Sequence, residues 1–331
     1  MKKAIATTLA LTMALSLAAC GSSTSSSSTA AESTADSSSA TAETITEGGK
    51  IGFLAPTLQT EFFIGIDNDL KAACEANGYE YTSVDFAGDS ATAVTGIENM
   101  VTAGCDVIVA MVSDTSCDDA LAAAQAEGVK IVECGVETAV YDCCLNVDQY
   151  NWGERIGEMA SNWAIEQLGA ENVNYVIYTT YQDADMQNRG QGIQDKIQEM
   201  MPEANLLEVV DIGKDIVGSG TSTTENMLQK YPDLNMIACY GDAAAVEAME
   251  AIKAAGLNSD DFGIFSCDGT NQALTSIANN DILRGTIASE AIGTIMFEYS
   301  ERLLAGETFD APVMMEGTEV TKENISDWYT G

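Results

Sequence analysis

The stretch KIGFLAPTLQTEFFIGIDNDLKAACEANGYEYTSV, residues 50–84, carries the pattern on which the fold prediction rests. The apolar run 50–55 predicts a strand. The segment 61–77 has helical periodicity and ends before Gly78, a residue type that often terminates helices. A second strand is expected at 79–84. A strand, a helix and a second strand in this order predict two parallel strands joined by a right-handed crossover.

The same alternation continues outward from this unit and restarts after Asp148. The further expected helices are 90–103, 117–127, 152–168, 184–200, 221–230 and 243–255, and the further expected strands are 106–111, 129–133, 173–178, 206–210, 236–240 and 262–266. Such alternation predicts parallel sheets with helices on both faces. Two successive runs therefore predict an α/β protein with two Rossmann-like lobes.

The N-terminus has the layout of a secretory signal peptide, which we expect at 1–19. Lys2 and Lys3 precede an apolar run that ends in small residues. The sequence Leu17-Ala18-Ala19-Cys20 resembles the lipobox of bacterial lipoproteins. This resemblance implies that Cys20 is the lipidation site and the N-terminus of the mature chain.

Residues 20–49 are rich in Ser, Thr and Ala, and Ile45 is the one large apolar residue among them. A segment of this composition cannot bury enough surface to offset its ordering entropy, so it predicts a flexible tether. The folded part is thus expected on the extracellular face of the cell membrane, held by lipid, or in the periplasm.

Composition narrows the function classes. The chain has 14 Lys+Arg against 51 Asp+Glu, a formal net charge of −37, and no His. A field of this sign repels nucleic acid, so no nucleic-acid partner is expected. Without His or a Cys-x-x-Cys pair, no zinc site is predicted. No Gly-x-Gly-x-x-Gly or Walker motif follows the first strand, so no nucleotide cofactor is predicted either.

Eight cysteines follow Cys20, and four of them, Cys105, Cys134, Cys239 and Cys267, lie in or beside strand-like apolar runs. Free Cys at such positions behaves as a small buried hydrophobic residue. We therefore expect buried thiols, with one or more disulfides as the alternative.

Several motifs together resemble one family. They are Ile51-Gly52-Phe53-Leu54, Thr60-Glu61-Phe62-Phe63, Gly104-Cys105-Asp106-Val107-Ile108-Val109, Arg189-Gly190-Gln191-Gly192, Tyr240-Gly241-Asp242-Ala243-Ala244-Ala245 and Cys267-Asp268-Gly269-Thr270. In this order and at these intervals, the folded part is similar to the ribose- and galactose-type periplasmic binding proteins of the type I class. The resemblance implies a ligand cleft between two lobes, a three-stranded hinge, and delivery of a bound solute to an ABC permease in the membrane.

On this basis one lobe is expected from 50–147 plus 289–316, and the other from 148–288 plus 317–331. The protein is expected to act as a monomer without a cofactor and without catalytic residues. An enzyme such as a glycosidase is disfavoured, because nothing marks one carboxylate as an acid and another as a nucleophile.

The expected ligand is a small polar molecule, most simply a sugar. A buried sugar needs carboxylates to accept, Arg to donate, and flat apolar walls against its C–H faces. In α/β lobes these groups follow the carboxyl ends of strands. The expected ligand-binding residues are Thr60, Phe62, Phe63, Asp148, Asp185, Arg189, Asp242, Asp268 and Ser289.

Family members stack the sugar on the pair that matches Phe62 and Phe63, although both could instead be core residues. Asp185 and Arg189 lie four residues apart on one helix face, which suits either joint ligand contact or a surface ion pair. The resemblance assigns sugar hydroxyls to Asp268.

Helix capping is an alternative role for Asp242 and Asp268. We expect Asp148 to be free for the cleft, because Asn151 and Glu154 could form a capping box. Trp152, Tyr181 and Tyr240 are further possible walls.

Departures from the ribose pattern bear on the ligand. Gly135-Val136 replaces an Asp-Arg pair, Gly241 replaces Asn and Ser289 replaces Gln. These changes argue against ribose itself and for a bulkier sugar, a polyol or a nucleoside. The acids Asp148, Asp185, Asp242, Asp268 and Glu290 outnumber Arg189, so a cationic ligand stays an alternative, as does a sensory receptor built on the same clamp.

Overall fold

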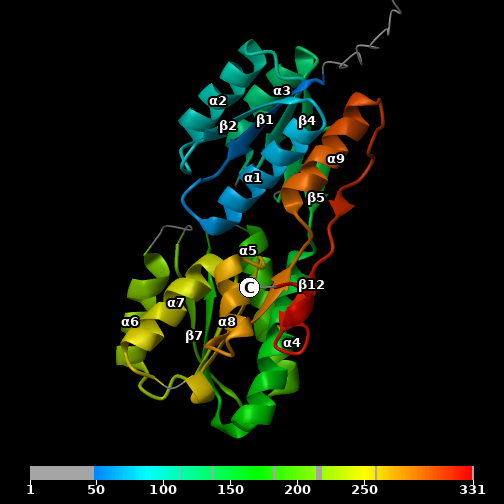
Figure 1. Ribbon diagram of the computed structural model, residues 1–331. Coiled ribbons are helices and arrows are strands. Elements are labelled where there is room, and N and C mark those ends of the chain that lie inside the picture. The colour runs from blue at the N-terminus through cyan, green and yellow to red at the C-terminus, as the bar shows by residue number, and fades with distance from the viewer. Residues whose placement is uncertain are drawn as a thin grey trace, which may run out of the picture. The chain divides into compact units, whose positions relative to one another are not determined.

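The computed structural model describes residues 48–112, 114–135, 138–181, 184–213, 218–257 and 259–329, which belong to one compact unit. The predicted signal peptide, Cys20 and nearly all of the predicted tether lie outside the described residues. Within them the chain forms two α/β lobes, each with a six-stranded sheet and helices on both faces (Figure 1). Among the described helices, none combines the length and the apolar character that a membrane crossing requires.

The first lobe has the strand order β11-β5-β4-β3-β1-β2, and its neighbouring strands are all parallel. Its strands are β1 (Lys50–Ala55), β2 (Glu80–Asp85), β3 (Val107–Ala110), β4 (Lys130–Cys134), β5 (Cys143–Asn146) and β11 (Val313–Met314). Its helices are α1 (Glu61–Ala76), α2 (Ser90–Thr102), α3 (Asp118–Ala126) and α9 (Ile292–Leu304).

Strand β1 shows why this sequence forms a central strand. Ile51 and Phe53 are fully buried in the core beneath α1 and α9. Leu54, which points to the opposite face, is fully buried in the core beneath α2 and α3. Side chains alternate between the two faces of a sheet, so a strand covered on both faces reads as a continuous apolar run.

The second lobe has the strand order β12-β10-β9-β8-β6-β7. Its strands are β6 (Asn174–Thr179), β7 (Asn205–Asp211), β8 (Met236–Cys239), β9 (Gly263–Cys267), β10 (Leu283–Ala288) and β12 (Thr318–Thr321). Its helices are α4 (Gln149–Gln167), α5 (Ala184–Met200), α6 (Ser219–Lys230), α7 (Asp242–Ala254) and α8 (Asn271–Ala278). Short 3-10 turns lie at Thr115–Cys117, Ala170–Asn172, Ser259–Asp261 and Ile325–Asp327.

The chain passes between the two sheets three times: from β5 to α4, from β10 to α9, and from β11 to β12. The pairing of β10 with β12 is antiparallel, whereas the other strand pairs of the second lobe are parallel. This departs from the expectation of purely parallel sheets. The reason is that β10 leads out of the second lobe, and β12 leads back into it after the chain has passed through α9 and β11 of the first lobe, so the two strands run in opposite directions.

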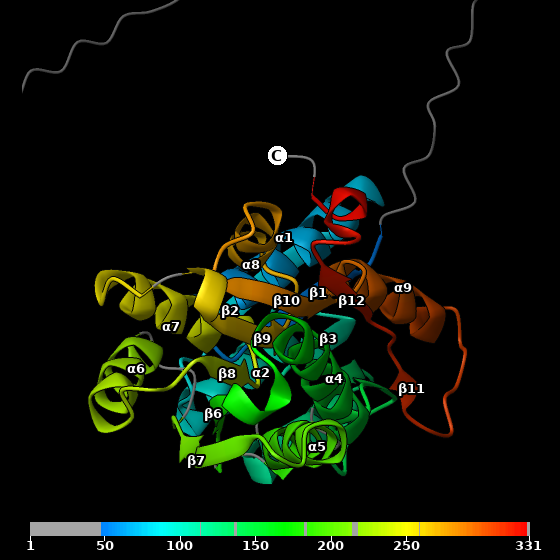
Figure 2. The same cartoon turned by 90° about the horizontal axis from the view of Figure 1, so that it is seen from below.

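Helices α4 and α5 lie side by side in the second lobe (Figure 2). Two glycines allow their backbones to touch. A Cβ on Gly153 would lie 2.0 Å from the carbonyl oxygen of Arg189, and a Cβ on Gly192 would lie 2.1 Å from the carbonyl oxygen of Tyr150. Only Gly permits so close an approach, and the contact places Arg189 beneath the first turn of α4.

Helix α4 begins three residues earlier than predicted. Asp148 is its N-cap, and the carboxylate of Asp148 accepts a hydrogen bond from the backbone N–H of Asn151 at 3.0 Å. The predicted capping box of Asn151 and Glu154 was therefore wrong, because Asp148 already satisfies a helix N–H. The individual elements β5, β10–β12, α8 and α9 were not predicted; β5 is only four residues long.

All eight cysteines after Cys20 are free and buried. Burial raises the pKa of the Cys74 thiol to about 12 and that of the Cys143 thiol to about 11. Both thiols are therefore neutral. Cys105, Cys134, Cys239 and Cys267 are also free and buried, which confirms the prediction of buried thiols.

Candidate functional site

Several predicted residues meet at the carboxyl ends of β8 and β9 in the second lobe. Tyr240 follows β8, and Asp268 follows β9. The backbone N–H of Asp242, at the start of α7, donates to the carboxylate of Asp268 at 3.1 Å. Arg189 reaches the same place from α5, where its Nη1 donates to the carbonyl oxygen of Tyr240 at 2.6 Å. Parallel strands bring their following loops to one edge, which is where ligands bind in such sheets.

The guanidinium of Arg189 is buried, with 6% of the residue exposed. Its Nε donates to Oε1 of Gln149 at 2.9 Å, and its Nη2 donates to the same oxygen. Its Nη1 also donates to Sγ of Cys267 at 2.8 Å, and the Trp152 ring lies 5.6 Å from its Cζ. A guanidinium has five N–H donors. The bond to Tyr240 and these three hydrogen bonds use four of them, so one N–H on Nη2 has no acceptor among the described residues.

The acceptors that Arg189 contacts among the described residues are all neutral: an amide, a backbone carbonyl and a thiol. Burial raises the pKa of the Cys267 thiol well above its usual value, although the charge of Arg189 acts to lower it. The thiol is therefore protonated and supplies no counter-charge.

Asp242 is fully buried and satisfied within its lobe. Its Oδ1 accepts from the hydroxyls of Ser266 and Thr286, and its Oδ2 accepts from the backbone N–H and the hydroxyl of Thr270. These four bonds occupy the acceptor positions of a carboxylate. Burial raises the pKa of Asp242 to about 6, and the hydrogen bonds act in the opposite direction. The geometry favours a role in bracing the turn after β9 over direct ligand contact.

The turn at Asp268 has an unusual backbone. Asp268 has φ +118° and Gly269 has φ +68°. A non-glycine residue with such a φ is strained, and such strain concentrates at functional sites. The half-buried carboxylate of Asp268 lies beside Gly241, where an added Cβ would be 3.0 Å from Oδ2. Gly241 thus leaves room for this carboxylate.

Three predicted residues of the first lobe, Thr60, Phe62 and Phe63, lie at the start of α1. Thr60 is the N-cap of α1 but makes no side-chain capping bond. Its Oγ1 is buried and has no hydrogen-bond partner among the described residues. Because an unsatisfied buried hydroxyl is costly, this oxygen stays a candidate for a ligand contact. Phe62 and Phe63 pack against the first-lobe core, with ring centroids 5.1 Å apart in an edge-to-face arrangement.

The remaining predicted residues lie outside the group that the hydrogen bonds given above form around Arg189 and Asp268. Asp148 is exposed and caps α4, and Asp185 is half-buried on α5 while the guanidinium of Arg189 turns toward Gln149. Ser289 is half-buried just after β10. Tyr181 is 53% exposed, and Glu290 is exposed.

Sequence reasoning missed two polar partners. Gln149, which holds the guanidinium of Arg189, lies 40 residues away from it in the chain. Glu61 in α1 of the first lobe accepts hydrogen bonds from the backbone N–H groups of Asn271 and Gln272 in the second lobe, at 3.0 and 3.4 Å. No local pattern marks such distant pairs.

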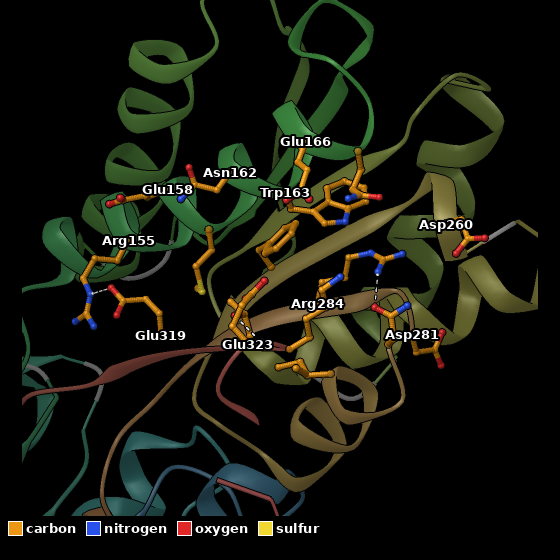
Figure 3. A pocket seen from close by; sticks show the side chains of 17 residues that line it. Arg155, Glu158, Asn162, Trp163, Glu166, Asp260, Asp281, Arg284, Glu319 and Glu323 are labelled. Atoms are coloured by element: carbon orange, nitrogen blue, oxygen red, sulfur yellow. Dashed lines mark hydrogen bonds and ion pairs between the residues drawn. The ribbon is translucent and has the colours of Figure 1, made fainter. Parts of the chain in front are cut away.

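A cavity of about 610 Å³ lies elsewhere in the second lobe (Figure 3). Arg284 lies over the Trp163 ring there, with its Cζ 5.0 Å from the centroid, and Arg155 is ion-paired with Glu319. None of the predicted ligand-binding residues lines this cavity. The site at the ends of β8 and β9 is therefore distinct from it.

Known proteins share this architecture. The ribose import binding protein RbsB of Bacillus subtilis is 26% identical over 275 residues, which are 80% of this chain and 86% of the relative. A solute-binding protein of an ABC transporter from Mycobacterium smegmatis, with bound glycerol, superposes with a TM-score of 0.75 at 24% identity. It covers 86% of this chain and 98% of its own. A periplasmic solute-binding protein from Actinobacillus succinogenes, with bound D-allose, has a TM-score of 0.75 at 19% identity and covers 85% and 100%.

Residues 51–308 match the family described as periplasmic binding protein domain, which is a family of binding proteins and not of enzymes. The matched range runs from β1 to the end of α9 and includes the turn around Asp268, while β11 and β12 follow it. Two α/β lobes, three crossings between them and this match together show that the chain belongs to the periplasmic binding protein domain family.

Proposed function

We propose that the chain is the extracellular, lipid-anchored solute-binding protein of an ABC importer, and that its ligand is a sugar or a sugar alcohol. Its relatives support this choice of ligand class, because they are named for ribose import or contain bound D-allose or glycerol. The departures at Gly241 and Ser289 favour a ligand other than ribose.

The observation that carries the proposal is the environment of Arg189. The buried guanidinium is held by neutral acceptors, and one Nη2 donor has no acceptor in the described part of the chain; we assign that donor to a ligand oxygen. Asp268 supplies a neighbouring acceptor, and the Thr60 hydroxyl is unsatisfied in the first lobe. One cationic donor, one anionic acceptor and one hydroxyl suit a neutral molecule with several hydroxyl groups.

The same geometry weakens the case for a cationic ligand. That alternative rested on an excess of acids around Arg189. Asp148 is exposed and used as a helix cap, and the Asp242 carboxylate is saturated by its own lobe. Two of the five acids therefore have other roles, so the excess of acids over Arg189 is smaller than the sequence suggests.

The two lobes, 50–147 plus 289–316 and 148–288 plus 317–331, would then act as rigid bodies that close on the ligand around the three crossings. The protein would act as a monomer, because each chain contains both halves of the site. Delivery to a permease accounts for the lipid anchor, which keeps the folded part near the membrane.

A thermal-shift screen against sugars, sugar alcohols, nucleosides and amines tests the ligand class, since a ligand that binds the native state raises its melting temperature. We expect stabilisation by at least one sugar or sugar alcohol and binding confirmed by calorimetric titration. Stabilisation by an amine alone would contradict the proposal. Loss of uptake of the same compound on deletion of the gene would separate import from sensing.

The lipid anchor is tested by Cys20→Ser. The variant should leave the membrane fraction and bind the ligand with unchanged affinity, because the anchor lies far along the chain from the site. Retention of Cys20→Ser in the membrane fraction would contradict lipidation at this residue.

A further inference from the structure

Glu61 joins the two lobes through the N-terminus of a helix. It is the first residue of α1 in the first lobe. Its Oε1 accepts from the backbone N–H of Asn271 at 3.0 Å, and its Oε2 accepts from that of Gln272 at 3.4 Å. These donors are the first two residues of α8 in the second lobe.

The backbone N–H groups in the first turn of α8 have two kinds of acceptor, one from Thr270 and one from Glu61. The Thr270 side chain accepts from the backbone N–H of Ala273 at 3.3 Å, and the Thr270 carbonyl accepts from Leu274 at 2.9 Å. The two N–H groups before these have no acceptor within a helix. Glu61 supplies that acceptor, so the cap of α8 is completed by a residue from the other lobe.

The position of this contact connects it to the candidate site. Glu61 lies between Thr60 and Phe62, the first-lobe candidates, while α8 follows the turn that carries Asp268. A bond between these two segments fixes the first-lobe half of the site against the second-lobe half. It can exist only when the lobes are close together.

We infer that Glu61 is a positioning residue for ligand binding, which stabilises the closed arrangement of the lobes by capping α8. This inference rests on the proposed function. A carboxylate at a helix N-terminus is favoured both by the aligned peptide dipoles and by charge-assisted hydrogen bonds. Because the contact is exposed, salt should weaken it. Stabilising the closed state raises ligand affinity, mainly by slowing dissociation.

Two variants remove the contact from opposite sides. Glu61→Gln removes the charge and keeps the size. Asn271→Pro removes one donor N–H at the first helical position, where Pro is favoured. The preceding residue Thr270 has ψ 152°, a conformation that Pro tolerates in its neighbour. Glu98→Gln, on an exposed residue of α2, is the control for loss of one negative charge in the same lobe.

Calorimetric titration and dissociation rates, with the strongest binder of the screen, test the inference. We expect either variant to bind about two- to tenfold more weakly through faster dissociation. The double variant should bind no more weakly than Glu61→Gln alone. The difference between wild type and Glu61→Gln should shrink at high salt, which a purely structural defect would not do. Glu98→Gln should match the wild type.

Unchanged affinity and dissociation in both single variants, with the wild type binding normally, would overturn the role of Glu61 and leave the proposed function standing. If no compound binds the wild type, the proposed function fails, and the contact is tested without ligand. Spin labels at Glu127→Cys in the first lobe and Glu225→Cys in the second are both on exposed residues, and the native cysteines of the described residues are buried. We expect Glu61→Gln and Asn271→Pro to lengthen the distance between labels; identical distances in all three proteins would overturn the inference.

Discussion

The two halves of the candidate site are built differently. In the second lobe, Arg189, Asp242 and Asp268 belong to one hydrogen-bond network that ties α4, α5, α7, β9 and β10 together. In the first lobe, the hydroxyl of Thr60 has no partner among the described residues, and the rings of Phe62 and Phe63 pack against the core. The second-lobe half is therefore held in place by its own hydrogen bonds, whereas under the proposed function a ligand would complete the polar part of the first-lobe half.

This difference follows from packing. In the second lobe, glycines let α4 and α5 touch, and the saturated carboxylate of Asp242 fixes the turn at Asp268. Preorganised polar groups lose little entropy when they bind a ligand. We therefore expect residues of the second lobe to contribute most of the ligand affinity, and residues of the first lobe to contribute less.

The largest effect is expected for Arg189→Ala. It removes the proposed ligand donor, both Arg189 donors to Oε1 of Gln149 and one of the donors to the Tyr240 carbonyl, all in a buried place. Affinity should fall by about 2 to 4 kcal/mol, roughly thirty- to a thousandfold. Calorimetric titration measures this. Arg302→Ala in the first lobe, which removes a guanidinium paired with Glu307, is the control and should keep full affinity; equal affinity of both variants would contradict the assignment.

The next effect is expected for Gly153→Ala in α4. Its Cβ would lie 2.0 Å from the carbonyl oxygen of Arg189, so α4 and α5 must move apart. We expect a loss of about 3 kcal/mol in the free energy of unfolding, measured with urea, together with weaker binding. Gly65→Ala in α1 is the matched change, because nothing lies within 4 Å of its Cβ. Gly65→Ala should raise the free energy of unfolding by about 0.5 to 1 kcal/mol. A loss of stability in both variants, or a gain in both, would contradict the proposed difference between the lobes.

Asp242→Asn tests whether the Asp242 carboxyl stabilises the turn after β9, through the pH dependence of the free energy of unfolding. Burial raises the pKa of Asp242 to about 6, so between about pH 4 and pH 6 the folded state binds more protons than the unfolded state. The free energy of unfolding that depends on this carboxyl must then fall as pH rises through this window. The advantage of the wild type over Asp242→Asn should shrink by about 2 kcal/mol from pH 4 to pH 7. Urea unfolding at several pH values measures this difference in the free energy of unfolding. A difference that grew as pH rose would contradict a raised pKa for the buried Asp242 carboxyl.

The smallest effect is expected for Phe62→Ala. A stacked ring contributes mainly apolar contact, which tolerates different sugars, so affinity should fall by about 1 kcal/mol, roughly fivefold, for each ligand that binds. Phe63→Ala should lower the melting temperature instead, because the Phe63 ring packs against Phe62 and the first-lobe core. Equal loss of affinity in both variants would show that the rings act only through the core.

The two-lobed fold could be predicted because each strand and helix carries its own local pattern. The strand at β1 was predicted with its observed bounds, and helix α5 likewise, since apolar runs and helical periodicity are local. The start of α4 could not be predicted from periodicity, because the side chain of Asp148 decides it. The antiparallel β12 was missed because four residues carry little pattern.

The candidate site was predictable only in part, for a related reason. Residues after strands can be recognised in the sequence, and Arg189, Tyr240 and Asp268 do come together. Their partners cannot be recognised: Gln149 and Glu61 act on residues 40 and 210 positions away. Whether a carboxylate is saturated, as Asp242 is, depends on four donors from three other segments.

A crystal structure of the protein with the tightest-binding compound of the screen tests the account most directly. We predict a ligand oxygen within hydrogen-bond distance of Arg189 Nη2, another at the carboxylate of Asp268, and the Phe62 ring against the apolar side of the ligand. The Asp242 carboxylate should keep its four bonds and not contact the ligand. A ligand bound instead beside Trp163 and Arg284, or one that leaves Arg189 and Asp268 untouched, would contradict the account.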